Sequence, residues 1–184
     1  MITTEFLSFS KFNEYGTWLK MQDHETRCLY FGISANDYVI DSLLEKVLTI
    51  PDDHYILVAK QGTKWVGTVH IAINGTTVEF GIIVHAEHRG QGIANQILDE
   101  AITWARNRGY KELFMHCLSH NTAIRHLCEK NGLKTTNMMG DSEVKVTLSP
   151  PTMITLAKEA AFKQRSAFHM MLQDTKNFYT ELYG

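Results

Sequence analysis

The sequence contains little cysteine and little proline, and it has no large excess of charge of either sign. Its three cysteines, Cys28, Cys117 and Cys128, are an odd number among 184 residues and do not form a disulfide framework. The formal net charge of −2 gives no electrostatic reason to expect a nucleic-acid partner. We therefore expect buried thiols and no nucleic acid among the partners.

Long hydrophobic runs are also missing from the sequence. No apolar stretch approaches the roughly 20 residues that a membrane span needs. The first sixteen residues, MITTEFLSFSKFNEYG, lack the basic start and the apolar run of a signal peptide. These absences lead us to expect a cytoplasmic protein with no membrane partner. Apolar residues make up 44% of the chain and charged residues 21%, which is ordinary for a globular domain.

The first half of the chain predicts a short strand, a helical region and then three consecutive strands. The turn residues Gln61-Gly62 and the hairpin signal Asn74-Gly75 separate the three strands and predict that they form an antiparallel meander. The expected elements are a strand at 5–10, a helix and a loop within 13–32, a helix at 37–48, and strands at 54–60, 64–73 and 76–84.

The second half begins with a different unit, in which a helix connects two strands. Apolar residues at helical spacing predict a helix over 94–108, followed by a strand over 112–118. A helical crossover makes that strand a parallel neighbour of the 78–84 strand. A second helix follows, with Asn121 as its cap and Gly132 as its stop.

The remaining residues predict a closing hairpin and a long helix. The hairpin comprises strands at 134–139 and 143–148 around Gly140-Asp141-Ser142. Pro150-Pro151 end this pattern, and an amphipathic helix follows, with Phe168, Met171 and Leu172 on its apolar face.

The predicted fold class is α/β, with a mixed, mostly antiparallel central sheet that is flanked by helices. We expect one domain over residues 1–149. We expect residues 150–184 to form a C-terminal amphipathic helix that packs on this domain or on a partner subunit. A homodimer is therefore an open alternative.

A glycine-bearing turn connects the predicted strand 76–84 to the helix 94–108. Residues 79–96 read EFGIIVHAEHRGQGIANQ. A strand that enters a helix through glycines directs unpaired backbone N–H groups at one point, where the helix dipole favours phosphate. The turn is not a P-loop, and a dinucleotide fingerprint would need a glycine where Asn95 stands. The pattern R-x-x-G-x-[GA] matches in full, with Arg89, Gly92 and Ala94.

This pattern resembles the acetyl-CoA loop of the GNAT family of N-acetyltransferases. The order of strand, loop, helix, strand and Asn121 helix is similar to that family's central block, and the similarity covers roughly residues 55–148. The segment NTAIRHLCEKNGL (121–133) resembles its second motif. Residues 19–44 faintly resemble the N-terminal part of protein-lysine acetyltransferase domains.

The resemblance implies an enzyme that transfers an acetyl group from acetyl-CoA to a primary amine. A protein lysine or N-terminus is slightly favoured over a small molecule as the acceptor. The resemblance places the diphosphate on the 89–94 loop and the pantetheine arm beside the end of the preceding strand and Asn121. The implied cofactor-binding residues are Ile82, Ile83, Val84, Arg89, Gly90, Gln91, Gly92, Ile93, Ala94 and Asn121.

An ammonium acceptor must lose a proton before it can attack, which calls for a general base. Glu79 is the first candidate because it shares a strand face with Gly81, which suggests space for a substrate. His116 is the second candidate, although a core histidine is the more frequent role for such a residue. Many members of the family place a tyrosine where this chain has Cys128, which puts a protein general acid in doubt.

Two groups of residues suggest a metal, but the sequence favours none. Cys117, His120, His126 and Cys128 match no standard zinc spacing. His85, Glu87 and His88 contain H-x-E, but the P-C-x-x-C half of the zinc deaminase motif is missing, so we expect exposed loop residues.

Two other functions stay open. One is a non-catalytic acyl-CoA-binding module, and the other is an acyltransferase with a different acyl donor or a small-molecule acceptor.

Overall fold

The structure is a computed structural model, and it describes residues 1–118, 121–131, 133, 135–138 and 141–183. The strands are β1 (Ile2–Phe6), β2 (His54–Gln61), β3 (Lys64–Asn74), β4 (Thr77–Val84), β5 (Glu112–Leu118), β6 (Thr135–Met138) and β7 (Asp141–Thr147). The α-helices are α1 (Phe12–Lys20), α2 (His24–Phe31), α3 (Asp37–Thr49), α4 (Ile93–Asn107), α5 (Thr122–Lys130) and α6 (Met153–Tyr183). Short 3₁₀ turns are η1 (Phe9–Lys11), η2 (Pro51–Asp53) and η3 (Ala86–His88).

The described strands form one seven-stranded sheet in the order β1-β2-β3-β4-β5-β7-β6, and β4–β5 is the one parallel pair among them. The predicted meander is confirmed, and so is the parallel pairing that the crossover helix required. The expected fold class, a mixed and mostly antiparallel sheet flanked by helices, is therefore correct.

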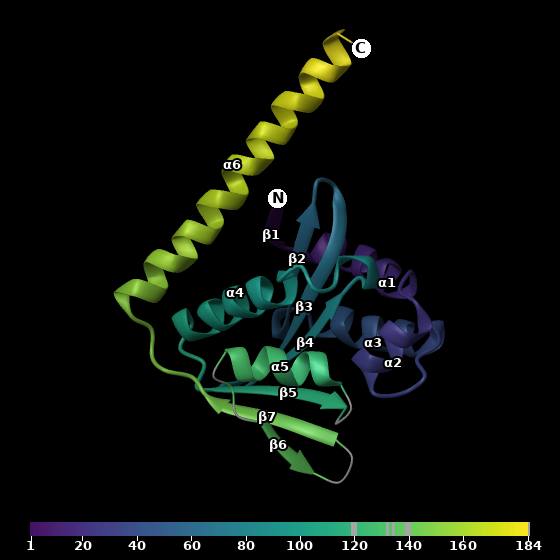
Figure 1. Cartoon of the computed structure of the whole chain (residues 1–184), viewed down its shortest axis with the longest axis vertical. Helices are drawn as coiled ribbons and strands as arrows, with labels where there is room; N and C mark the ends of the chain where they lie inside the picture. The colour runs from purple at the N-terminus through teal and green to yellow at the C-terminus, as the bar shows by residue number, and fades with distance from the viewer. Residues whose placement is uncertain (119–120, 132, 134, 139–140, 184) are drawn as a thin grey trace.

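Helices pack on the sheet (Figure 1), and the described residues form two hydrophobic cores between the sheet and its helices. One core lies under α4 and α5 and includes Ile97, Leu98 and Leu127, all of which are buried. The other lies under α1 and α3 and includes Tyr15 and Ile40. Alternation along the strands supplies both cores, because successive side chains point to opposite faces of the sheet.

The ends of the sheet differ from the sequence prediction. The first strand covers 2–6 rather than 5–10, because β1 pairs with β2 only as far as Phe6 and a 3₁₀ turn then begins at Phe9. The predicted turn residues Asp141 and Ser142 lie within β7, paired with Met138 and Asn137. The proposed Gly132 stop and Gly140 lie outside the described residues.

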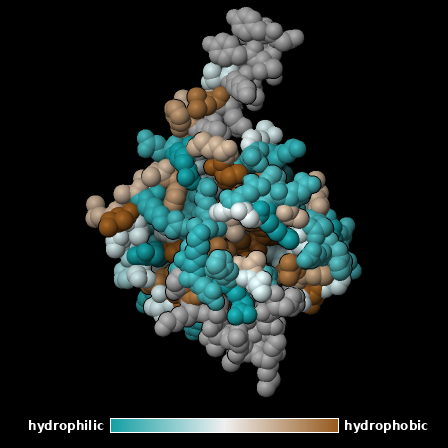
Figure 2. All heavy atoms as spheres, in the orientation of Figure 1, coloured by the Kyte–Doolittle hydropathy of each residue, from teal (hydrophilic) through white to brown (hydrophobic). Residues whose placement is uncertain are grey.

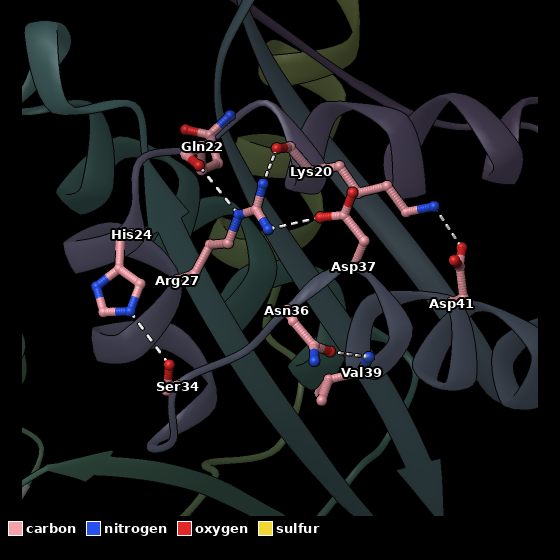
Figure 3. Close-up of polar contacts among 9 residues, drawn as sticks. All are labelled: Lys20, Gln22, His24, Arg27, Ser34, Asn36, Asp37, Val39 and Asp41. Carbon is pink, nitrogen blue, oxygen red and sulfur yellow. Dashed lines mark hydrogen bonds and ion pairs between the residues drawn. The ribbon is translucent and has the colours of Figure 1, made fainter.

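Arg27 holds α2 between its neighbouring helices, as Figure 3 shows. Its Nε donates to the Gln22 carbonyl oxygen at 3.0 Å, and Nη2 donates to the Lys20 carbonyl oxygen at the end of α1. Its Nη1 lies 2.7 Å from the Asp37 carboxylate at the start of α3. One guanidinium thus fixes α2 against the end of α1 and the start of α3, and α2 contributes to both cavities described below.

Helix α6 packs against the body through its first half and then extends away from it (Figure 1). Ser166 is buried against Thr4 of β1, and Lys158 pairs with Asp99 of α4 at 2.6 Å. Phe168 and Met171, which were expected on a packed face, are 63% and 70% exposed. Figure 2 shows such hydrophobic residues on the surface of the projecting helix. A partner subunit on this helix therefore stays a prediction, as does the domain division at residue 150.

No helix in the described ranges combines the length and the apolar character that crossing a membrane requires.

Candidate active site

Strand β4 has two different faces, as its alternation predicts. Val78, Phe80 and Ile82 are buried in the core beneath α4. Glu79 is exposed on the opposite face, which it shares with Gly81. The predicted orientation of Glu79 is therefore confirmed.

β4 and β5 separate halfway along their length. Their parallel pairing runs from Thr77–Glu112 to Glu79–Phe114 and ends there in the described strands. β5 continues to pair with β7 on its other side as far as Leu118. The second half of β4 therefore has a main-chain edge that is open to a ligand, because backbone groups without a strand partner need another hydrogen-bond partner.

A cavity of about 400 Å³ opens beside this edge and reaches the start of α4. Nine of the ten predicted cofactor residues line it: Ile82, Ile83, Val84, Arg89, Gly90, Gly92, Ile93, Ala94 and Asn121. Gln91 does not line the cavity, and its side-chain amide donates to the Glu87 carbonyl oxygen at 3.4 Å. Further lining residues that sequence reasoning did not identify come from α2 and α5, and include Thr26, Leu29 and Lys130.

The start of α4 is arranged to receive an anion. Gly92 is the N-cap and has the left-handed conformation, with φ of +78°. In the described chain no side chain caps this helix, so the first-turn N–H groups carry the positive end of the helix dipole uncompensated. A phosphate group fits such a site.

Arg89 connects this loop to α2. Its Nη2 donates to Thr26 Oγ1 at 2.5 Å, and Thr26 Oγ1 donates to Asp23 Oδ2 at the same distance. The hydrogen bonds from Thr26, and more weakly the Arg89 charge, hold the pKa of the Asp23 carboxyl below its ordinary value. The Arg89 guanidinium therefore connects the loop to α2, and both residues of this contact, Arg89 and Thr26, line the cavity.

Asn121 lies at the opposite wall, beyond the end of β5. Its side-chain oxygen accepts a hydrogen bond from the Ile124 N–H at 3.3 Å, so it caps α5 as predicted. The residue is buried and also lines the cavity.

A second cavity, of about 490 Å³, lies next to the first. Glu79 and His116, the two candidate bases, both line it. His116 is exposed and packs edge-to-face on Phe114 with ring centroids 4.6 Å apart, so the role of a core histidine is wrong for this residue. The structure thus places both candidates on one open cavity.

Tyr30 of α2 lies between the two cavities, and its importance was missed. Together with Leu29 it lines both of them. A Cβ built on Gly81 would lie 2.7 Å from the Tyr30 hydroxyl oxygen, so the missing side chain at Gly81 makes room for this tyrosine and not, as the sequence suggested, for a substrate. The hydroxyl lies 2.9 Å from that of Tyr15. Burial raises the pKa of Tyr30 to about 12, so it stays protonated near neutral pH.

A histidine pair forms another part of the second cavity. His54 Nδ1 and His70 Nε2 are 3.1 Å apart, and their rings are stacked. Burial, and then the neighbouring His54, lower the pKa of His70 to about 3. Burial also lowers the pKa of His54, so both rings are neutral at pH 7, with one nitrogen donating and the other accepting. Lys46 is the exposed cation of the same cavity.

Solved structures with the same architecture include bacterial acetyltransferases. The GNAT domain of S. lividans PAT has a TM-score of 0.67 and 16% identity, over 79% of this chain and 89% of that one. A spermidine N-acetyltransferase from Vibrio cholerae, in complex with CoA and spermine, has a TM-score of 0.65 and 16% identity, over 80% and 95%. At these identities the likeness establishes the fold.

Sequence comparison gives the family directly. The uncharacterized N-acetyltransferase YobR of Bacillus subtilis (strain 168) is 33% identical over 73 residues, which are 40% of this chain and 29% of that protein. The match thus spans less than a third of that relative's length. The model of the Acetyltransferase (GNAT) family matches residues 18–133. This range includes strand β4, which lines both cavities, the Arg89–Ala94 loop and Asn121. The chain therefore belongs to the GNAT family of acetyltransferases.

Proposed function

We propose that the protein transfers an acetyl group from acetyl-CoA to a primary amine. One observation carries this proposal: a single strand, β4, forms part of both cavities. Ile82, Ile83 and Val84 line the cavity that reaches the helix start, and Glu79 to Gly81 line the other. A cofactor that lies along the end of β4 would thus bring its acyl group to the side chain of Glu79.

The first cavity suits coenzyme A in shape and in charge. The diphosphate would bind the uncapped start of α4 beside Gly90 and Gly92, and the pantetheine arm would pair with the open edge of β4. The Vibrio cholerae structure with CoA supports a CoA site on this fold. The contacts in the present cavity are proposed from its lining residues.

In the second cavity, Glu79 would accept the proton of the incoming ammonium, directly or through a water molecule. An alkylammonium has a pKa near 10.4 and no lone pair, so it cannot attack until this proton is removed. His116 is the alternative base, because it is exposed to the same cavity. The amine nitrogen would then bond to the thioester carbon, and the bond from that carbon to sulfur would break.

The leaving thiolate requires stabilisation, and Cys128 cannot supply it because it is fully buried in the core beneath α4. We propose that the Tyr30 hydroxyl donates a hydrogen bond to the developing negative charge, with Tyr15 as the donor to Tyr30. Burial raises the pKa of the Tyr30 hydroxyl, which disfavours loss of its proton to the thiolate. Tyr30 would therefore stabilise the charge, and the proton would come from solvent.

Tyr30→Phe tests this role. We expect kcat to fall on the order of 100-fold, because one hydrogen-bond donor to the transition-state charge is lost. Coenzyme A affinity, measured by calorimetry, should change little, because the aromatic ring remains. A Tyr15→Phe variant controls for loss of the Tyr15–Tyr30 contact alone. Full activity in Tyr30→Phe would contradict the role.

The acceptor is the least constrained part of the proposal. A lysine side chain or a peptide N-terminus is slightly favoured over a small molecule as the acceptor, because residues 19–44 resemble the N-terminal part of protein-lysine acetyltransferase domains. Alkyl amines fit the mixture of apolar walls and Glu79 in the second cavity. Incubation with acetyl-CoA and either a peptide mixture or a panel of polyamines and amino acids, followed by mass spectrometry, decides between them. Cofactor binding with no product from either set would favour the non-catalytic module.

A further inference from the structure

The turn η3, which precedes the Arg89 loop, brings three potential metal ligands together. One ligand atom from each of His85, Glu87 and His88 lies within 4.8 Å of the others. A 3₁₀ turn places residues three apart above one another, which aligns the two imidazoles. The sequence favoured exposed loop residues without a metal, and the pattern H-x-E-H gave no indication of this convergence.

The backbone holds the two histidines in this arrangement. The His88 N–H donates to the His85 carbonyl oxygen at 2.9 Å, and the His85 N–H donates to Val66 of β3 at 3.0 Å. The ring centroids are 5.8 Å apart. The turn is therefore anchored to the sheet, so bringing the ligand atoms together requires side-chain rotation rather than refolding.

Two of the ring nitrogens have no partner. Nδ1 of His85 and Nδ1 of His88 are shielded from solvent and make no hydrogen bond within the described residues. A buried nitrogen without a partner is costly, and a cation that accepts its lone pair would remove that cost. The Glu87 side chain is exposed and forms no ion pair in the described part of the chain, so its carboxylate is available.

We propose that His85, Glu87 and His88 form a binding site for a Zn²⁺-like divalent cation. Two imidazoles and one carboxylate are a ligand set that Zn²⁺ accepts, with the fourth position left to water. Bond lengths near 2.1 Å in a tetrahedral site separate ligand atoms by about 3.4 Å, so ligand atoms that lie within 4.8 Å of one another need to approach by at most about 1.4 Å. The proposal does not depend on acetyl transfer, because the three ligands come from η3 and its cap, but the site shares His88 with the first cavity.

Calorimetric titration of the metal-free full chain with Zn²⁺, without coenzyme A, tests this site. We expect one tight site whose affinity falls more than tenfold in His85→Gln, in His88→Gln and in Glu87→Gln. The matched control is His24→Gln, because His24 lies 3.7 Å from Cys28 Sγ and forms the competing imidazole–thiol pair. Unchanged affinity in the three variants, or loss of the site in His24→Gln, would overturn the proposal.

Two measurements guard against variants that fold poorly. In the unmodified chain Zn²⁺ should shift the NMR signals of two imidazoles, of which one is absent from the spectrum of His85→Gln and the other from that of His88→Gln. Co²⁺ should bind without the near-ultraviolet charge-transfer band that a cysteine ligand produces. A thiolate band would assign the metal to a cysteine and refute the site on η3.

Discussion

Replacing Glu79 with glutamine is expected to lower the rate of acetyl transfer by about 10²–10⁴-fold, the usual contribution of a general base. Glutamine keeps the size of the side chain and its place on the exposed face of β4, but it cannot accept the ammonium proton. The rate should recover partly at high pH, where more of the amine is already deprotonated. The measurement is the steady-state rate over a pH series, together with coenzyme A affinity, which should stay unchanged.

Two further variants make the Glu79 result specific. Glu14→Gln removes an exposed carboxylate of α1 outside both cavities and should leave the rate unchanged. His116→Gln separates the two candidate bases, because its ring faces the same cavity. A large loss in His116→Gln with a small loss in Glu79→Gln would transfer the role of base to His116. Small losses in both would leave the proton to solvent.

The strand, loop and helix that build the cofactor cavity could be predicted because their determinants are local. Alternation gave the two faces of β4, and the glycines of the turn gave the entry into α4. Asn121 could be recognised as a cap from its position before an apolar periodic segment. Each of these features depends only on residues that are close in sequence, within a single strand or a single turn.

The second cavity could be predicted only in part: the sequence indicated Glu79 and His116 as candidate bases, but distant segments of the chain build the other walls. Tyr30 lies against Gly81 from helix α2, and Arg27 ties that helix to backbone carbonyls and to Asp37, which come from different parts of the N-terminal region. No short pattern encodes these contacts. The exposure of His116 is not encoded locally either, because alternation assigns the residue to a strand face but does not say whether another element covers that face.

The same distinction explains the error in the first strand. Residues 5–10, EFLSFS, look like a strand, but β1 stops pairing with β2 after Phe6 and the chain enters η1 at Phe9, although β2 itself continues to His54. The local sequence thus indicated a strand without fixing its end, because the end depends on where β1 leaves β2.

Replacing Gly92 with valine is expected to weaken coenzyme A binding by more than tenfold, which is over about 1.4 kcal/mol. A Cβ on Gly92 would meet no atom of the protein within 4 Å, so the added side chain would occupy the open space that we assign to the diphosphate. Calorimetric titration with coenzyme A measures the loss. Unchanged affinity in a folded variant would contradict the proposed binding of the diphosphate at the start of α4. It would also contradict the proposed arrangement of the rest of the cofactor.

Backbone strain must be separated from this loss, because Gly92 has φ of +78° and valine resists that conformation. Gly109, which follows the other end of α4, has φ of +79° and also meets no atom within 4 Å of a built Cβ. Gly109→Val therefore imposes the same conformational penalty outside the cavity. If both variants lower the melting temperature equally but only Gly92→Val loses coenzyme A, the affinity depends on the space at the start of α4. Equal losses of affinity would mean that strain in α4, rather than contact with the diphosphate, controls binding.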